Sequence, residues 1–383
     1  MKIAVIGCKG LPVSQGGIEH HCKELYSRVV QLGHSVDLYS RCSYTKSKPF
    51  SSYYSDGIKV IPLPSIESRG LDALFNSAFS SVIAGIRQYE IVHFHGIGPS
   101  LFCGIPKILS SAKIIVTCHG LDWSRSKWGK SSSFFLRKGE KSAVMFANQL
   151  ITVSQELKTY FQETYSIDPI YIPNAPASYP ASDTDFTFGK SLQIHEGRYI
   201  LYVGRLVPEK CPDLLLQAFQ SLNLKGWKLV FVGDQSDTSL FKSKLIDLAA
   251  SNPNILFTGI LRGARLAEIV RSAGIFVLPS ELEGLPLVLL EAMNEGIPVI
   301  ASDIPVHKSL LAGKYGLLFQ TNSLDDCTQC LNWAIQNLAE MQQMAHRAKH
   351  YVQTQYNWDR IAQETLKIYE SQFKDEMQGV LMK

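Results

Sequence analysis

Two cations in the second half of the chain have the types and spacing of a binding site for a charged group. Arg205 and Lys210 lie in the segment GRLVPEK, directly after an apolar run, Tyr199–Val203, that we predict to be a strand. Paired cations at the carboxyl end of a strand suit a diphosphate, because a departing diphosphate gains negative charge as its bond breaks. Arginine offers a planar fork of donors and lysine a mobile point charge. Solvated surface cations are the alternative interpretation.

Two acids follow a later predicted strand, in the segment PSELEGLPLVLLEAM. Glu283 and Glu291 have seven residues between them, and Pro286 suits the first turn of a helix. Carboxylates so placed, one in the loop and one about two turns along the helix, can accept hydrogen bonds from two sets of sugar hydroxyls. Backbone N–H groups near Gly284 and Leu285 would face the same ligand. Alternatively, Glu283 caps the helix and Glu291 is a buried or paired acid.

A glycine pair stands in the first loop of the chain. The loop from Cys8 to Gly17 follows an apolar run and precedes a helical pattern that starts at Ile18. Gly16 and Gly17 would let a ligand approach bare backbone N–H groups at the positive end of that helix. A simple tight turn fits as well. The loop lacks G-x-G-x-x-G, so a dehydrogenase is excluded.

One histidine follows a predicted strand of the first half. His119 comes just after Lys113–Thr117, and His93 and His95 end the preceding strand. A lone histidine is more often structural than functional, yet His119 stands at a strand end, where ligands of parallel sheets bind. We expect His93 and His95 to be mainly structural, with His95 the better candidate for a ligand contact.

The segment from Ser124 to Phe146 is basic and aromatic, with Glu140 as its only acid. Basic and aromatic residues together suit an anionic membrane surface or a lipid-diphosphate acceptor. A basic loop followed by a core-facing helix is the alternative, and no nucleic-acid motif accompanies the segment. The candidates for acceptor or membrane contact are Asp122, Trp123, Lys127, Lys130, Arg137 and Lys138.

The elements that would position these residues alternate between short apolar runs and amphipathic helical patterns. The apolar runs that we predict to be strands are Lys2–Gly7, Ser35–Tyr39, Ile91–His95, Lys113–Thr117, Gln149–Val153, Tyr199–Val203, Lys228–Val232, Ile255–Phe257, Ile275–Leu278 and Pro298–Ala301. This alternation predicts an α/β protein with parallel sheets covered on both faces. The alternation of predicted strands and helices is interrupted by a stretch that contains Pro173, Pro176 and Pro180, and it resumes after this stretch. We predict two Rossmann-like, doubly wound domains that face each other across a cleft. The expected ranges are 1–175 for the acceptor domain, 176–197 for a linker, 198–355 for the nucleotide-sugar domain and 356–383 for a C-terminal helix packing back on the first domain.

Composition limits the class of protein. Of the 383 residues, 45% are hydrophobic and 19% are charged, which is ordinary for a folded protein. The start MKIAVIGCKG is too short in apolar residues for a signal peptide, and no run reaches the length of a membrane span. Eight scattered cysteines indicate reduced thiols. We therefore expect a cytoplasmic location, at most at the inner face of the cell membrane.

Four motifs together resemble the family 4 retaining glycosyltransferases of the GT-B fold, over nearly the whole chain. They are SQGGIE, VTCHG, VGRLVPEK and the segment with two glutamates; the string HGLDW…KWG resembles more weakly the bacterial transferases that build cell-surface polysaccharides. The resemblance implies that Arg205 and Lys210, after Gly204, bind the donor diphosphate. It implies that Glu283 binds hydroxyls of the donor sugar and that Glu291 binds the ribose.

The same resemblance gives roles to the remaining candidates. Gly284 and Leu285 would contact sugar and phosphate through their backbones, and Gly16 and Gly17 would lie near the phosphates and the acceptor. His119 would donate or accept a hydrogen bond at the donor sugar. Catalysis is thus expected from His119, Glu283, Arg205 and Lys210.

The implied reaction moves a sugar from a nucleotide diphosphate sugar, most simply a UDP- or GDP-sugar, to a hydroxyl of a glycan or lipid-linked acceptor. We expect no cofactor, no metal and no nucleic-acid partner. Two other interpretations stay open: a GT-B-fold epimerase or phosphorylase, and a non-catalytic subunit that only binds sugar nucleotide. Donor isomerisation without an acceptor would identify the epimerase.

Overall fold

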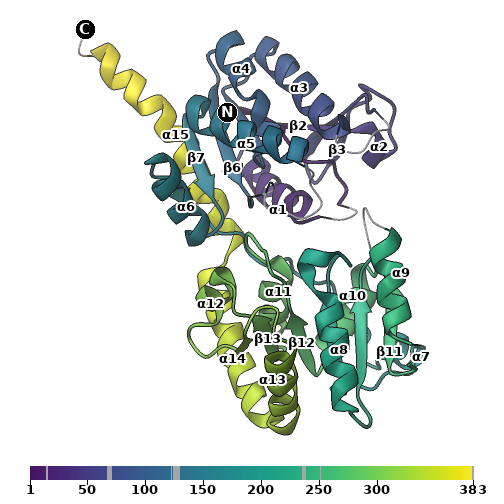
Figure 1. The fold of residues 1–383 in the computed structure, drawn as a ribbon. Helices are drawn as coiled ribbons and strands as arrows, with labels where there is room; N and C mark the ends of the chain where they lie inside the picture. Colours follow the sequence, from purple (N-terminus) through teal and green to yellow (C-terminus); the bar gives the residue numbers. More distant parts are fainter. Residues whose placement is uncertain are drawn as a thin grey trace. The chain divides into compact units, whose positions relative to one another are not determined.

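The chain divides into two compact units, which we describe separately (Figure 1). The computed structural model describes residues 1–13, 16–66, 71–121, 123, 130–234, 239–250 and 252–381. Residues Met1–Asn174 and Asn357–Lys383 form the first unit, and Ala175–Tyr356 form the second. Both units are Rossmann-like α/β sheets, which confirms the predicted fold class.

The first unit is built on an eight-stranded sheet in the order β3-β4-β2-β1-β5-β6-β7-β8. All described pairs are parallel except the hairpin of β3 and β4. The sequence did not predict β3, β4 or β8. The strands are β1 (Lys2–Ile6), β2 (Ser35–Arg41), β3 (Tyr53–Ser55), β4 (Ile58–Leu63), β5 (Ile91–His95), β6 (Lys113–Cys118), β7 (Gln149–Thr152) and β8 (Ile170–Tyr171).

The helices of the first unit begin and end largely at residues that favour such ends. Ser154 caps its helix by accepting a hydrogen bond from the Leu157 N–H at 3.2 Å, and Gly33, with φ of 91°, follows the end of the first helix. The helices are α1 (Gly17–Gln31), α2 (Cys42–Thr45), α3 (Leu71–Ile86), η1 (Pro99–Phe102), α4 (Gly104–Leu109), α5 (Lys130–Phe146), α6 (Gln155–Tyr165) and α15 (Trp358–Leu381).

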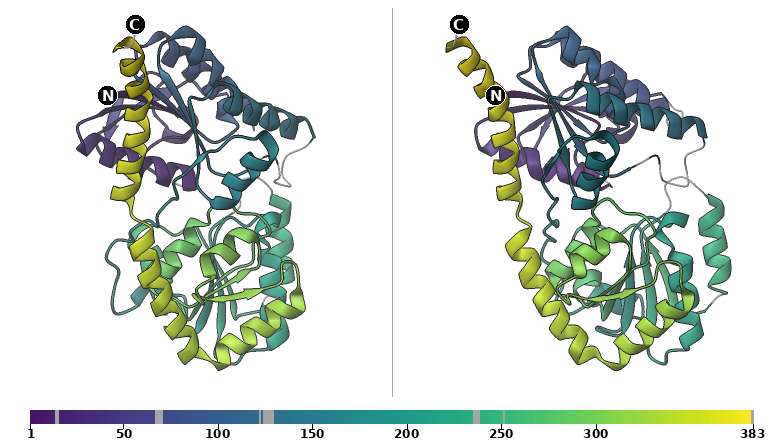
Figure 2. Two further views of the ribbon diagram at one scale, coloured as in Figure 1. Left: turned by 90° about the vertical axis from the view of Figure 1, so that its left-hand side faces the viewer. Right: turned by 60° about the vertical axis from the view of Figure 1, so that its left-hand side comes forward.

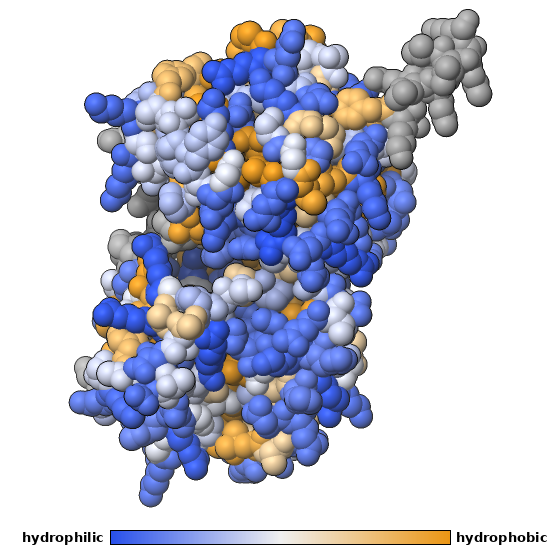
Figure 3. Space-filling model, turned by 180° about the vertical axis from the view of Figure 1, so that it is seen from behind, coloured by the Kyte–Doolittle hydropathy of each residue, from blue (hydrophilic) through white to orange (hydrophobic). Residues whose placement is uncertain are grey.

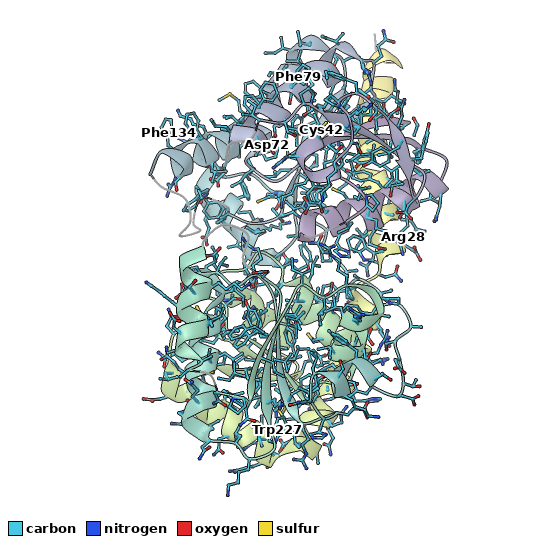
Figure 4. The ribbon with its side chains drawn as sticks, turned by 90° about the vertical axis from the view of Figure 1, so that its right-hand side faces the viewer. Arg28, Cys42, Asp72, Phe79, Phe134 and Trp227 are labelled. Atoms are coloured by element: carbon cyan, nitrogen blue, oxygen red, sulfur yellow. The ribbon has the colours of Figure 1, made fainter. Side chains whose placement is uncertain are left out.

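The last helix, α15, belongs to the first unit although the second unit precedes it in the chain. It packs beside α1 in both views of Figure 2. Arg28 of α1 donates from Nε to Asp359 Oδ1 at 2.6 Å, at the position labelled in Figure 4. Deeper in the unit, the Tyr369 hydroxyl lies 2.6 Å from His93 Nδ1. The end of the chain therefore completes the core around β5.

The second unit is built on a six-stranded sheet in the order β11-β10-β9-β12-β13-β14, with every pair parallel. Successive residues of its central strand point into different cores: Tyr199 and Leu201 into one, Ile200 and Tyr202 into the other. Both faces are therefore covered, as expected for a parallel sheet. The strands are β9 (Tyr199–Val203), β10 (Lys228–Val232), β11 (Ile255–Gly259), β12 (Ile275–Leu278), β13 (Val299–Ser302) and β14 (Leu317–Phe319).

The helices of the second unit cover these two faces. Among the described residues of the whole chain, no helix combines the length and apolar character needed to cross a membrane. The helices are α7 (Thr187–Ser191), η3 (Pro208–Lys210), α8 (Pro212–Leu222), α9 (Ser239–Leu248), α10 (Gly263–Arg271), α11 (Leu287–Glu295), α12 (Pro305–Leu311), α13 (Leu324–Gln336) and α14 (Leu338–Gln355).

The segment 176–197, which its prolines predict to be a linker, is a folded part of the second unit. It contains α7, and Phe186 and Ile194 are each only 1% exposed within the core on the α11 side of the sheet. The Gly189 N–H donates to Glu268 Oε1 at 2.9 Å. The burial of these apolar side chains therefore holds the segment on the second unit, although most of its backbone is irregular.

Each sheet has one point where the direction of strand addition reverses. In the second unit the chain adds β10 and β11 on one side of β9, then crosses over to add β12 on the other side. The loops after β9 and β12 therefore diverge at the carboxyl edge, which is where open α/β sheets bind ligands. In the first unit the corresponding point lies between β1 and β5.

The loops after β9 and β10 touch through two glycines. Gly204 N–H donates to Val232 O at 3.0 Å, and a Cβ on Gly233 would lie 2.0 Å from Gly204 O. Gly233 also has φ of 131°, a conformation that side chains disfavour. This close approach sets the position of Arg205, the next residue.

Gly233→Ala is expected to destabilise the second unit by about 1–3 kcal/mol more than Gly226→Ala, because only the first adds a clash to the backbone strain. Gly226 is the matched control, since its φ is also positive, at 74°, and a Cβ added there would meet nothing within 4 Å. Thermal unfolding of both variants followed by calorimetry measures the difference. Equal losses of stability would contradict the close contact.

Candidate functional site

The loops at the switch point of the second unit bring Lys210 and Glu283 into contact. Lys210 ends η3 after β9, and Glu283 lies in the loop after β12; its Oε1 accepts a charge-assisted hydrogen bond from Lys210 Nζ. Their side chains are 16% and 10% exposed. The structure thus joins two residues that are 73 positions apart and that their motifs predict to share one site.

This contact decides the charge state of Glu283. Burial alone would raise its pKa, but the neighbouring Lys210 ammonium outweighs that effect, so the pKa of Glu283 is lowered from its usual value. The carboxylate is therefore ionised at neutral pH and can accept hydrogen bonds from a ligand.

Arg205 is held differently, by its backbone. Its carbonyl accepts a hydrogen bond from the Tyr202 hydroxyl at 2.8 Å, and its guanidinium Nη2 lies 3.6 Å from Glu209 Oε1. Glu209 is buried, whereas the Arg205 side chain is 33% exposed. Arg205 therefore keeps donors that can reach an anion at the same edge of the sheet.

The N-terminus of α11 lies beside Glu283. The helix begins at Leu287, and the N–H groups of Leu289 and Leu290 donate to Pro286 O at 3.0 and 3.2 Å. Backbone N–H groups ahead of these have no partner within the helix, and the helix dipole makes this end positive. Gly284 and Leu285 lie in this stretch, as predicted from the position of Pro286.

Glu291 lies in the second turn of α11 and is buried. Its Oε2 accepts a hydrogen bond from the Tyr179 hydroxyl at 2.8 Å. Burial, assisted by repulsion from Glu295, raises the pKa of Glu291 to about 7, against the opposing effect of Tyr179 and a backbone N–H at Ala177. Tyr179 comes from the segment expected to be a linker, so no sequence pattern indicated this partner.

A histidine that the sequence motifs do not indicate lies near the ion pair. His307 of α12 is fully buried, with Nδ1 2.9 Å from Ser302 O, and its Nε2 has no partner in the described part of the chain. Burial lowers the pKa of His307 to about 4, and Lys210 acts in the same direction while Glu283 opposes it. Its place just after β13, at the same edge as the other candidates, is the signal that could have identified it.

The glycine loop of the first unit is organised by a buried acid. Glu19, 3% exposed, accepts a hydrogen bond at Oε1 from the Lys9 N–H at 3.1 Å. A Cβ on Gly16, whose φ is 108°, would lie 1.9 Å from Glu19 Oε2. Gly17 then begins α1. The backbone conformation therefore favours glycine at position 16, and a side chain there would also displace the Glu19 carboxylate. Glu19 is a supporting residue that the glycine pattern alone did not reveal.

His119, itself partly exposed, belongs to a cluster of otherwise buried rings. Its Nε2 lies 3.1 Å from His95 Nδ1, and His95 Nε2 lies 2.6 Å from the Tyr26 hydroxyl. His93 and His95 are fully buried, as structural residues would be. Burial is the main reason that the pKa of His119 falls well below its usual value, so the imidazole is neutral at physiological pH.

The basic segment is only partly described. Asp122 and Lys127 lie outside the described residues, and of Lys130 only its place at the start of α5 is described. Trp123 Nε1 donates to the buried Glu140 Oε2 at 2.7 Å, and the Arg137 guanidinium lies 4.1 Å from the centre of a Trp123 ring. The segment therefore combines a fixed tryptophan with a helix that has one buried and one exposed face.

Comparison with known proteins gives the family. Residues 183–374 match the family described as Glycosyl transferases group 1, and residues 15–175 match Glycosyltransferase Family 4. The chain therefore belongs to the group 1 glycosyl transferases, and the predicted resemblance to family 4 is confirmed.

Individual proteins agree with this assignment over the whole length. An uncharacterized glycosyltransferase of Methanocaldococcus jannaschii is 25% identical, over 96% of this chain and 98% of its own. Sucrose-phosphate synthase from Thermosynechococcus elongatus has a similar structure, with a TM-score of 0.83 and 20% identity over 98% and 99% of the two chains. Anabaena HepE, solved with UDP-glucose, gives 0.80 and 18% over 97% and 100%. The likeness to these two solved structures shows the GT-B fold, as predicted.

The raised pKa of Glu291 gives a testable pH dependence of stability. Glu291 has a pKa of about 7 in the folded state and an ordinary value in the unfolded state. Its protonated form therefore stabilises the folded state, and this contribution is fully present below pH ~4.5. That contribution is lost as the pH rises through 7, at a cost on the order of 3 kcal/mol. Glu291→Gln should therefore be more stable than the wild type at pH 8 and nearly equal to it at pH 5.

Melting temperatures of the two proteins between pH 5 and 8 provide the measurement. Glu163→Gln is the control, because Glu163 is exposed on α6 of the first unit, away from Glu291. A constant difference between wild type and Glu291→Gln across this range would show that Glu291 is ionised throughout.

Proposed function

We propose that the chain is a retaining glycosyltransferase that moves a sugar from a nucleotide diphosphate sugar to an acceptor hydroxyl. The contact between Lys210 and Glu283, at the switch point of the second sheet, carries the proposal. A cation for the diphosphate and an ionised acid for the sugar stand side by side there, which is the pairing that a sugar diphosphate needs.

Roles in the donor site follow from chemistry. Lys210 has three N–H donors, so it can keep its bond to Glu283 while donating to a phosphate oxygen. Arg205 binds the second phosphate, Glu283 accepts from sugar hydroxyls, and Glu291 accepts from the ribose in place of the Tyr179 hydroxyl. Backbone groups at Gly204, Gly284 and Leu285 complete the site.

Transfer with retention needs no protein nucleophile. The bond between the sugar carbon and the diphosphate oxygen breaks, the acceptor oxygen bonds to that carbon on the same face, and the acceptor proton passes to the departing diphosphate. Arg205 and Lys210 neutralise the charge that develops on the diphosphate, so the scheme requires no metal ion. His119, as a neutral imidazole, binds a hydroxyl of the donor sugar.

A UDP-sugar is the first donor to test. The similar Anabaena protein was solved with UDP-glucose, and GDP-sugars are the next choice. We assign binding of the donor nucleotide to the second unit and acceptor binding to the first, over Gly16, Gly17 and the basic segment. The proposed location is the cytoplasm.

Lys210→Ala should lower kcat/KM for sugar transfer about 10²–10³-fold, because it removes the cation that meets the departing diphosphate. Lys225→Ala is the matched control, since Lys225 is exposed in the turn before β10, at the opposite edge of the sheet. Thermal stabilisation by UDP-, GDP- and ADP-sugars first identifies the donor, and product formation then gives the rates. Equal rates in the two variants would refute the site.

We further propose that the acceptor is a glycan or lipid-linked sugar of a cell-surface polysaccharide and that the first unit contacts an anionic membrane. Apolar side chains gather on the upper face of this unit in Figure 3. Ile86 of α3, Ile108 of α4 and Met145 of α5 are 72–78% exposed, and Phe134, labelled in Figure 4, is 56% exposed. Exposed cations accompany them: Arg87, Lys107, Arg137, Lys138 and Lys141. Apolar groups edged by cations are typical of surfaces that bind anionic lipid.

Arg137→Glu combined with Lys138→Glu should reduce cosedimentation with vesicles containing anionic lipid at least several-fold, since each cation near such a surface contributes about 1 kcal/mol. Lys190→Glu with Lys225→Glu makes the same change in net charge on the second unit and should have little effect. Binding to neutral vesicles should be weak for every form. Sedimentation that does not differ between the two double variants would exclude this face.

A further inference from the structure

Three histidines of the first unit bring ring nitrogens together from three different elements. His21 lies on α1, His95 ends β5, and His119 follows β6. One nitrogen of each lies within 4.8 Å of the other two, and His95 Nδ1 and His119 Nε2 are 3.1 Å apart. Within the described part of the chain, the cluster consists of these three imidazoles and includes no carboxylate.

His21 has the tautomer that a metal ligand needs. Its Nδ1 lies 2.6 Å from Asn174 Oδ1, which can only accept, so Nδ1 carries the proton and Nε2 carries a lone pair. Nε2 is buried and has no hydrogen-bond partner among the residues that the structure describes. Buried polar atoms almost always have a partner, so this lone pair is unusual. Histidines that bind metals typically donate their other N–H to a fixed oxygen, as His21 does to Asn174.

His95 can present its second nitrogen in the same way. The Tyr26 hydroxyl, 2.6 Å from His95 Nε2, can accept a proton held there, which leaves the lone pair of Nδ1 directed at His119. The same hydroxyl lies 2.9 Å from His93 Nδ1 and can donate to it. His95 therefore has a fixed oxygen partner on the far side of its ring, like His21.

We propose that His21, His95 and His119 bind one late transition-metal ion of the Zn²⁺ type. Zinc–nitrogen distances of about 2.0–2.1 Å in a tetrahedral site place ligand nitrogens about 3.4 Å apart. The pair formed by His95 and His119 already has nearly this spacing, and His21 Nε2 must move closer by at most roughly 1.4 Å. Three imidazoles suit zinc or copper and disfavour Mg²⁺ and Ca²⁺, which prefer oxygen ligands. His119 is partly exposed whereas His21 and His95 are buried, so His119 is the ligand nearest to solvent. Three imidazoles leave the fourth position of a tetrahedral ion for a water molecule.

The ion is separate from the transfer scheme and would act on it through His119. If His119 binds the donor sugar through Nε2, an ion on Nε2 and that sugar contact exclude one another, whereas a sugar contact through Nδ1 is compatible with the ion. This consequence rests on the proposed function, whereas the metal site itself does not.

The test measures metal binding to the full chain without any substrate. Chain stripped with a chelator and dialysed against Zn²⁺ should retain one ion, measured by elemental analysis. Co²⁺ in its place should give the intense visible absorption of a four-coordinate site. His21→Ala and His119→Ala should each weaken binding at least 100-fold, and circular dichroism melts check that the variants fold. Asn174→Ala should weaken it about 10–100-fold and Asn174→Asp should restore it, which a purely structural residue would not do.

The control addresses binding at the surface. His346 and His350 are exposed and four residues apart on α14, the spacing at which a helix captures an ion from solution. The double variant His346→Ala/His350→Ala should keep the stoichiometric ion. Loss of the ion in this variant, no retained ion in the wild type, or full binding by both His21→Ala and His119→Ala would overturn the proposal. Should the ion bind without inhibiting transfer, a sugar contact through His119 Nε2 is excluded and the metal site stands.

Discussion

The contact between Lys210 and Glu283 is the interaction on which the proposed donor site depends. It joins the loops after β9 and β12, the two strands that flank the switch point of the second sheet. Removing two charges from water has a cost that a hydrophobic pair of similar size would avoid, so a buried ion pair is weak evidence for stability. Its place at the ligand-binding edge favours a functional reason for keeping it. With Lys210 absent, Glu283 would be a buried charge without its cation.

The sheets were largely predictable because their strands are short apolar runs between amphipathic helices. β5, β9, β10 and β12 have the residue bounds that the pattern predicts. The strands that the pattern did not predict are short or lie at the edges of the sheets: the hairpin β3–β4, the two-residue β8, and β14. β4 also contains Pro62, which a strand pattern disfavours. Such elements depend on pairing with distant residues, which a local pattern does not record.

The residues of the candidate site also fall into two groups, those that the sequence could predict and those that it could not. Arg205, Lys210 and Glu283 follow strands, and all parallel strands of a sheet end at one edge, so sequence alone could place them together. Their supports come from distant parts of the chain. Tyr179 reaches Glu291 from a stretch that looked like a linker, and Asn174 reaches His21 across 153 positions. These contacts arise from packing, and no motif indicates them.

The helix α15 has a consequence for how the protein is made. A ribosome synthesises the first 174 residues of the first unit, then the whole of the second unit, and only then the helix that carries Trp358 and Tyr369. Until that helix emerges, α1 lacks its neighbour and the His93 ring lacks the tyrosine hydroxyl that it meets in the finished fold. The nascent first unit is therefore incomplete while the second folds. Apolar surface that is exposed in this way during folding makes a chain prone to aggregation. The exposure ends when α15 packs against the first unit.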